Sequence, residues 1–351
     1  MEKRQLRSGF TTGACAAAAA KGAALLLRDG PPVASVVLQL PAGFAASFNL
    51  HGQATAPEQA SCFVIKDAGD DPDVTHGIEL HATITRTSGV GLLIVAGVGI
   101  GQVTKPGLAV AVGLPAINPV PRRMIEQAVA EVFPDETGLR LTLSIPDGEL
   151  RAEKTLNARL GILGGLSLLG TTGVVKPISH KAWTDTLEVA LDVALAAGQR
   201  PAVLSTGRTS ELAARQYFNL PEECFVMMGD HIGYTLQACH RKGIPAVALA
   251  AQFAKLLKIA CGHPQTHVRH SQLDLGPLLK WAIEIGLDAA ERQKLELANT
   301  ARQVFETCGV DSPLVTRVAQ EALSIWQQQV PGAEFSILLV DYQGQVAKRY
   351  R

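Results

Sequence analysis

Two arginines occupy the first turn of an expected helix, where positive charge is electrostatically unfavourable. They end the segment from Gly97 to Ile125, GVGIGQVTKPGLAVAVGLPAINPVPRRMI. A helix N-terminus carries about half a positive charge, so each arginine costs roughly 0.3 kcal/mol or more unless an anion joins it. Arg122 and Arg123 therefore favour an anion-binding site, and solvated side chains are the alternative.

A second polar segment, Lys66 to Gly77, contains four aspartates (KDAGDDPDVTHG). Its spacing does not fit an EF-hand, and a solvated turn is the plain alternative. His76 stands beside a glycine just before an expected strand, where it can present a base or a hydrogen-bond donor. His76 and Asp67 are the candidate catalytic residues.

Two glycine turns follow expected strands in the second half of the chain. They supply the candidate cofactor-binding residues Thr206, Gly207, Gly229 and Asp230. Ligands of an open parallel sheet lie beyond the carboxyl ends of its strands, and Asp230 can accept hydrogen bonds from a ribose diol. The sequence contains neither GxGxxG nor a Walker A motif, which disfavours dinucleotide dehydrogenases and kinases but leaves S-adenosylmethionine. Ordinary turns remain the alternative.

The segment from Cys261 to His270 has one cysteine and three histidines, as in some zinc sites. No carboxylate or second ligand pair completes such a site, so we expect a polar connecting loop and no protein-bound metal. Cys15 follows a helix start that would lower its pKa. In an alanine-rich helix it is expected to be a packed residue rather than a nucleophile.

Composition limits the classes of partner. The 351 residues include 32 basic and 32 acidic side chains, which disfavours a nucleic-acid or anionic-membrane partner. The six cysteines form no CxxC pair, as in reduced cytoplasmic proteins. No apolar run is long enough to span a membrane.

Hydrophobic patterning predicts two domains of an α/β protein, residues 1–156 and 157–351. The first is α+β, with a helix over Ala14–Leu27 and a buried strand within Gly91–Gly101. Its other expected elements are strands over Val33–Leu40, Cys62–Lys66, Ile78–Arg86 and Arg140–Ile145, and a helix from Pro121.

The second domain repeats strand, loop and helix, which predicts a parallel, Rossmann-like sheet. Its expected strands are Ala202–Ser205, Phe225–Met228 and Ala246–Ala250. A helix over Lys181–Ala197 precedes them. A mostly helical tail, Leu273–Gln329, and a closing strand, Phe335–Val340, follow.

Four segments together resemble the CbiD family, the cobalt-precorrin-5B C-1 methyltransferases of anaerobic cobalamin biosynthesis. They are LRSGFTTGACAAAAAKGAALLL, KDAGDDPDVTHGIE, the Gly97–Ile125 segment and NARLGILGGLSLLGTTGVVKPIS. The resemblance extends from Leu6 to about His270. This chain departs from the family pattern at Ala14, where threonine or serine is common, and at Val268, where serine is common.

The resemblance implies methyl transfer from S-adenosylmethionine to C-1 of a cobalt-containing corrinoid. This substrate is a polyanion, so cations and helix N-termini are expected to bind it. The expected substrate-binding residues are Thr11, Thr12, Lys105, Asn118, Arg122, Arg123 and Lys176, with Arg7 in support. His76 and Asp67 are expected to accept a proton or to orient the ring.

The sequence also allows two other functions: a non-catalytic corrinoid carrier and a nucleotide-dependent oxidoreductase. Association into homo-oligomers and transient contacts with neighbouring pathway enzymes are also open.

Overall fold

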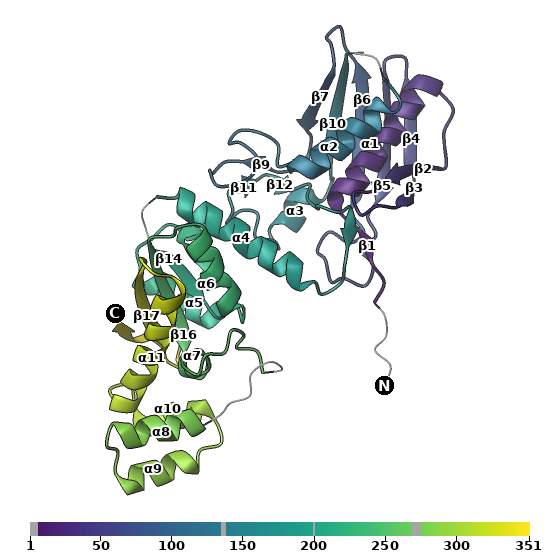
Figure 1. Ribbon diagram of the computed structural model, residues 1–351. Helices are drawn as coiled ribbons and strands as arrows, with labels where there is room; N and C mark the ends of the chain where they lie inside the picture. The colour runs from purple at the N-terminus through teal and green to yellow at the C-terminus, as the bar shows by residue number, and fades with distance from the viewer. Residues whose placement is uncertain (1–5, 135–137, 199–200, 269–274) are drawn as a thin grey trace. The chain divides into compact units, whose positions relative to one another are not determined.

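The computed structural model describes residues 6–134, 138–198, 201–268 and 275–351, and the chain divides into two compact units (Figure 1). Unit 1 is Met1–Ser179 and unit 2 is His180–Arg351. The sequence boundary after residue 156 differs from this division. Residues 157–179 belong to unit 1 because their short strands β11, β12 and β13 pair with β9, β8 and β1 of that unit.

Unit 1 contains three helices and thirteen strands among its described residues. The helices are α1 (Thr12–Asp29), α2 (Pro119–Ala130) and α3 (Gly148–Ala152). The strands are β1 (Gly9–Phe10), β2 (Ser35–Gln39), β3 (Ala45–Asn49), β4 (His51–Ala56), β5 (Gln59–Ile65), β6 (Glu79–Arg86), β7 (Leu92–Ala96), β8 (Gly99–Ile100), β9 (Gln102–Val103), β10 (Leu139–Ser144), β11 (Ile162–Leu163), β12 (Gly165–Leu166) and β13 (Val174–Val175).

The core of unit 1 lies between α1 and a five-stranded sheet of order β4-β5-β6-β10-β7. Strand β6 alternates as a half-buried strand should: Leu80, Ala82 and Ile84 are buried and their neighbours are not. Helix α1 is buried on nearly all sides because its many alanines allow close approach to the sheet and to α2 (Figure 1).

One prediction for unit 1, the burial of a strand, was wrong. The sequence predicted a buried strand within Gly91–Gly101, but β7 is an edge strand and of its residues only Ile94 is buried. The glycines that follow serve a different purpose. Strands β8 and β12 come so close that a Cβ atom on Gly165 (φ 156°) would lie 2.2 Å from the backbone of Gly99. The two glycine-dense segments of the sequence therefore pack against each other.

Unit 2 is an α/β unit whose described elements alternate as predicted. Its strands are β14 (Ala202–Ser205), β15 (Phe225–Met227), β16 (Ala246–Gln252), β17 (Glu334–Val340) and β18 (Val346–Tyr350). Its helices are α4 (His180–Ala196), α5 (Arg208–Tyr217), the 3-10 helix η1 (Glu222–Cys224), α6 (Ile232–Arg241), α7 (Phe253–Ala260), α8 (Gly276–Glu284), α9 (Ala289–Glu296), α10 (Ala301–Cys308) and α11 (Pro313–Gln329).

The sheet of unit 2 has the order β15-β14-β16-β17-β18, parallel except for β18. Both faces are covered: along β14, Leu204 points into one hydrophobic cluster and Val203 into another. This confirms the α/β fold class with a parallel, Rossmann-like sheet. The strand order reverses between β14 and β16, which is where doubly wound sheets bind ligands.

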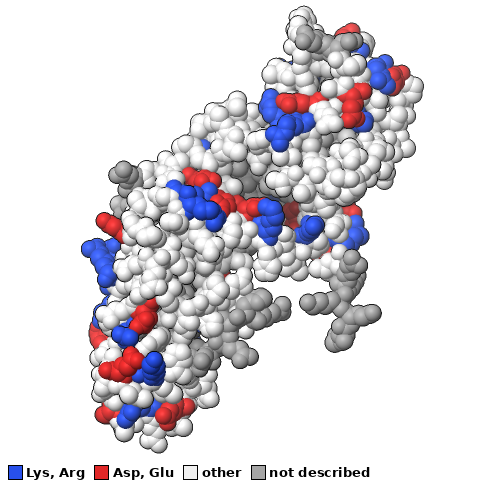
Figure 2. Space-filling view, viewed as in Figure 1, with Lys and Arg blue, Asp and Glu red and all other residues white. Residues whose placement is uncertain are grey.

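The charged side chains in Figure 2 lie close to partners of the opposite sign, with wide uncharged areas between them. No helix among the described residues is long and apolar enough to cross a membrane.

Candidate functional site

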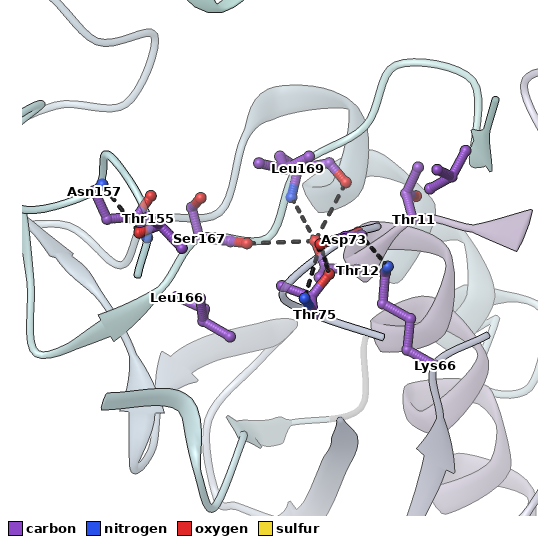
Figure 3. Close-up of a pocket in the computed structure, with 11 residues that line it drawn as sticks. Thr11, Thr12, Lys66, Asp73, Thr75, Thr155, Asn157, Leu166, Ser167 and Leu169 are labelled. Carbon is purple, nitrogen blue, oxygen red and sulfur yellow. Dashed lines mark hydrogen bonds and ion pairs between the residues drawn. The ribbon is translucent and has the colours of Figure 1, made fainter. Parts of the chain in front are cut away.

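A cavity of about 170 Å³ in unit 1 gathers hydroxyl, amide and charged side chains from four parts of the chain (Figure 3). Its lining residues are Thr11, Thr12, Lys66, Asp73, Thr75, Thr155, Asn157, Leu166, Ser167, Leu169 and Val175. Of the expected substrate-binding residues, Thr11 and Thr12 lie here.

Lys66 is the least expected member of this lining. It follows β5 directly, where a lysine would ordinarily reach solvent, yet it is 1% exposed. Its Nζ donates to Oδ2 of Asp73 at 2.6 Å. Burial would raise the pKa of Asp73, but the Lys66 ammonium and bonds from the amide and hydroxyl of Thr75 hold that pKa below its ordinary value.

The N-terminus of α1 forms another side of the cavity. The hydroxyl of Thr11 accepts the Ala14 amide as the N-cap. The hydroxyl of Thr12 is hydrogen-bonded to the backbone of Ser167 and Leu169, at 3.0 Å from the Leu169 nitrogen. The two threonines thus fix the helix start to the loop after β12.

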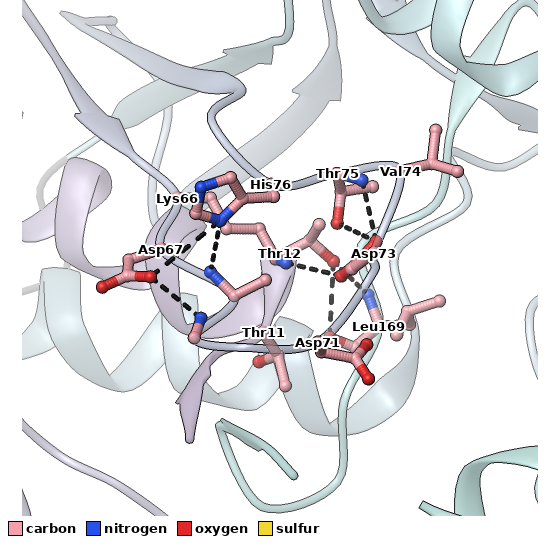
Figure 4. A network of polar contacts seen from close by, with 12 residues as sticks. Thr11, Thr12, Lys66, Asp67, Asp71, Asp73, Val74, Thr75, His76 and Leu169 are labelled. Carbon is pink, nitrogen blue, oxygen red and sulfur yellow. Dashed lines mark hydrogen bonds and ion pairs between the residues drawn. The ribbon is translucent and has the colours of Figure 1, made fainter. Parts of the chain in front are cut away.

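The acidic loop brings His76 and Asp67 together beside the cavity (Figure 4). Arg7 pairs with Asp67 there. Arg7 donates hydrogen bonds to both carboxylate oxygens of Asp67 and thereby lowers the pKa of Asp67 to about 2. Nδ1 of His76 accepts the Ala68 amide at 3.1 Å, so the proton of the neutral ring is on Nε2. The half-exposed imidazole therefore presents a donor, and Asp67 is a weak base at neutral pH.

The helix that carries Arg122 and Arg123 provides fewer amide donors than its position suggests. Pro119 and Pro121 leave Val120 as the one residue of the first three with a backbone N–H. The Asn118 side chain makes no capping bond, although the Asn118 amide donates to the Leu168 carbonyl at 3.0 Å. Anion binding here would depend on side chains.

The two arginines also differ from each other. Nε of Arg122 lies 3.0 Å from Glu126, one turn along the helix. Arg123 is exposed and has no ion-pair partner among the described residues. The Lys105 stem lies against Gly161, and Lys176 is exposed after β13. No described contact or cavity groups these four cations.

In unit 2, the predicted turns lie at the carboxyl edge of the sheet. Thr206 and Gly207 follow β14 next to the reversal of strand order, and the Thr206 amide donates to Ala250 of β16 at 3.3 Å. A Cβ atom at Gly207 would meet nothing within 4 Å, so its backbone is open to a ligand. The exposed Trp183 ring lies against Gly229.

Asp230 is engaged by residues that the sequence did not suggest. Its Oδ1 accepts hydrogen bonds from Lys255 and, at 2.6 Å, from the hydroxyl of Thr266. Burial opposes ionisation, but Lys255 and Thr266 hold the pKa of Asp230 below its ordinary value. Burial and the nearby Lys255 lower the pKa of Lys258, which donates to the Thr266 carbonyl.

The residues that sequence reasoning missed share one property: each reaches its partner through folding of the chain and not through the local pattern of its own element. Trp183 of α4 reaches Gly229, and Lys66 reaches Asp73 only because the acidic loop folds back. The one available signal was Lys66 itself, a charged residue directly after an apolar strand.

No metal site is described at the cysteine–histidine segment. Within the described ranges, no group of three metal-ligating side chains occurs, and His270 lies outside those ranges. Cys15 is buried, and this burial raises its pKa to about 12, as a packed residue requires. The helix start that would lower the pKa is outweighed by desolvation.

The fold and site define a two-unit α/β protein. Unit 1 contains a cavity lined by hydroxyl groups and by the Lys66–Asp73 pair, and unit 2 has glycine turns at the carboxyl edge of its sheet, where a ligand can bind. A protein-family model described as CbiD matches residues 1–177, and one described as CbiD, C-terminal domain, matches residues 265–351. The first match ends within two residues of the unit 1 boundary.

Relatives match almost the whole chain. The cobalt-precorrin-5B C(1)-methyltransferase of Geobacter metallireducens is 53% identical over 99% of this chain and 99% of its own. The enzyme of the same name from Pelobacter propionicus is 51% identical over 97% and 95%. The crystal structure of the cobalamin biosynthesis protein CbiD from Archaeoglobus fulgidus is 32% identical, covers 73% of this chain and 80% of that chain, and has a TM-score of 0.39. The chain belongs to the CbiD family.

Proposed function

We propose that this chain transfers a methyl group from S-adenosylmethionine to C-1 of cobalt-precorrin-5B, in anaerobic cobalamin biosynthesis. The observation that carries the proposal is the near full-length similarity to relatives with that name. Cobalt belongs to the substrate. All six cysteines are free thiols, which supports a reducing cytoplasmic location.

For the substrate, the proposal assigns Thr11, Thr12, Lys105, Asn118, Arg122, Arg123 and Lys176. The carboxylate arms of a corrinoid would meet these donors around its rim. Thr11 and Thr12 have the firmest structural support because they line the cavity. Among the arginines, Arg123 is the stronger candidate, since Glu126 neutralises part of the charge of Arg122.

For the methyl donor, the proposal assigns Thr206, Gly207, Gly229 and Asp230. The open backbone at Gly207 and the exposed Trp183 ring fit a polar group and an adenine, respectively. The occupied Oδ1 of Asp230 fits a ribose diol less well than a free carboxylate would.

S-adenosylmethionine supplies an electrophilic methyl group on a sulfonium. The acceptor is an electron-rich ring carbon, so the protein needs no nucleophile, in line with the buried Cys15. Its main task is to position the ring, which can account for about 7–11 kcal/mol of a bimolecular barrier. We assign His76 and Asp67 to orienting the ring, through the Nε2 donor of His76 and the Arg7–Asp67 pair.

The test is isothermal titration with S-adenosylhomocysteine, followed by a methyl-transfer assay on cobalt-precorrin-5B. An enzyme binds the first and methylates the second. A corrinoid carrier would bind the corrinoid but not S-adenosylhomocysteine. A nucleotide-dependent oxidoreductase would instead bind a nicotinamide cofactor, and that result would contradict the proposal.

A further inference from the structure

The Lys66 ammonium is a buried cation with unused hydrogen-bonding capacity. An ammonium has three N–H donors, and Lys66 uses one of them, on Asp73; no second acceptor for Nζ occurs among the described residues. A buried charge is stable only when it is paired and hydrogen-bonded. Because Lys66 lines the cavity, the remaining donors can be satisfied by a molecule within it.

Ser167 adds a second polar residue to the lining of the same cavity. The residue is 8% exposed, and no hydrogen bond of its hydroxyl is described among the residues that the structure covers. It lines the cavity from the loop after β12, whereas Lys66 enters from the end of β5 (Figure 3). Two polar residues from different segments thus line one space.

The start of α1 adds positive potential to this space. The helix has 18 residues, and its first turn contains no acidic side chain. No acceptor for the Thr12 amide is described in the resolved ranges of the structure. A helix of this length presents about half a positive charge at its N-terminus. Together with Lys66, it more than offsets the charge of Asp73.

We infer that the cavity between Lys66, Ser167 and the N-terminus of α1 binds a carboxylate group. This inference deepens the proposed function, on which it rests for the identity of the ligand. The carboxylate has two sources there: a rim arm of the corrinoid, or the amino-acid end of the methyl donor. For the second source, Asp73 would accept the neighbouring ammonium.

The main test measures binding by isothermal titration to three full-length variants. Ser167→Ala removes an unpartnered hydroxyl and is expected to fold normally. Lys66→Met/Asp73→Asn removes the ion pair without leaving a lone buried charge. Ser47→Ala, at an exposed serine of β3, is the matched control. The probes are S-adenosylhomocysteine and cobyrinic acid, whose rim arms are free carboxylates.

We expect one probe to lose about tenfold in affinity with Ser167→Ala and more with the double variant, with no change for Ser47→Ala. Loss for S-adenosylhomocysteine alone identifies the methyl donor as the source, and its decarboxylated analogue should then bind all variants alike. Loss for cobyrinic acid alone identifies the corrinoid arm. Unchanged affinity of both probes for both cavity variants would overturn the inference.

A further measurement separates this inference from the proposed function. Replacing sodium chloride with sodium propionate at constant ionic strength should raise the melting temperature of unit 1 in wild type. The rise should be smaller in Ser167→Ala. That rise supports the carboxylate site whether or not the two larger probes bind. Failure of both larger probes to bind to wild type would contradict the proposed function alone. No shift in wild type, together with no binding of either probe, would overturn both.

Discussion

Nζ of Lys66 lies 2.6 Å from Oδ2 of Asp73, and the two charges share a cavity that also holds the start of α1. Lys66 is 1% exposed, whereas the Asp73 side chain is 25% exposed. The pair therefore joins a fully buried charge to one that retains some water.

Removal of the lysine charge alone should destabilise unit 1. Lys66→Met leaves Asp73 partly buried without its cation, which costs about 3 kcal/mol. Lys66→Met/Asp73→Asn should cost less, because no charge is stranded. All three tryptophans of the chain lie in unit 2: Trp183, Trp281 and Trp326. Tryptophan fluorescence therefore does not report on unit 1, and its unfolding is measured by hydrogen exchange at the α1 amides. Wild-type protection in Lys66→Met would contradict the prediction.

The sequence predicted unit 2 more accurately than unit 1, for a physical reason. Strands β14 and β16 are buried on both faces, so each is a continuous apolar run between turn residues. The predicted bounds of β14, Ala202–Ser205, were confirmed. Two-residue strands such as β11 and β13 have no periodicity to detect, which is why the boundary predicted after residue 156 differs from the division after Ser179.

The candidate site was predictable only where it is local in sequence. The cap at Thr11 and the turn at Gly207 follow from a few neighbouring residues. The cavity depends on segments about 155 residues apart, such as Thr12 and Ser167, and no single window contains that information. The roles assigned to the site residues, those of Lys105 and Lys176 included, remain predictions.

The Arg7–Asp67 pair should give unit 1 a small stability that depends on pH. The folded pKa of Asp67 is about 2, below an unfolded value of about 3.9, so the contribution is complete above about pH 4 and is lost as pH falls through about 2. The Asp67 side chain is 44% exposed, which limits the effect to about 1 kcal/mol or less.

Hydrogen exchange of wild type and Asp67→Asn from pH 3 to pH 6 measures this effect, after correction for intrinsic exchange rates. The difference in unfolding free energy should be constant above about pH 5 and should shrink below about pH 4. A difference that grows on acidification would show that Asp67 has a raised pKa and would make it a candidate proton acceptor again.

Alkylation should distinguish the cysteines by burial. Cys15 and Cys62 are each 1% exposed, and burial raises the pKa of both thiols to about 12, so neither supplies thiolate at neutral pH. Cys261 and Cys308 are partly exposed and should react first with iodoacetamide. Peptide mass spectrometry after brief labelling of the native protein gives the order. Early modification of Cys15 would contradict its assignment as a packed residue.

Gly13→Ala should destabilise unit 1 even though alanine is the better helix former. A Cβ atom at Gly13 would lie 2.6 Å from Cγ of Pro121, where α1 and α2 meet. Overpacking of this kind costs about 1–3 kcal/mol, against a propensity gain of about 1 kcal/mol. The double variant Gly13→Ala/Pro121→Gly should recover stability, because it removes both side-chain atoms that the added methyl group meets, Cγ at 2.6 Å and Cβ at 2.8 Å. Additive effects in this cycle would exclude the contact as the cause.

Charge reversal at Arg123 should weaken corrinoid binding more than the same change at Arg122. Arg123 is exposed without an ion-pair partner in the described ranges, so its whole charge is available to a carboxylate, whereas Arg122 is paired with Glu126. We expect Arg123→Glu to lower the affinity for cobyrinic acid about tenfold or more at low salt.

Arg140→Glu, at an exposed position of β10, is the control with the same change in net charge. The effect at Arg123 should diminish as ionic strength rises, because exposed charges are screened over about 10 Å at 0.1 M salt. Equal losses in Arg123→Glu and Arg140→Glu would mean that net charge alone attracts the corrinoid. In that case the two arginines at the start of α2 are solvated, as two prolines and a paired Glu126 would allow.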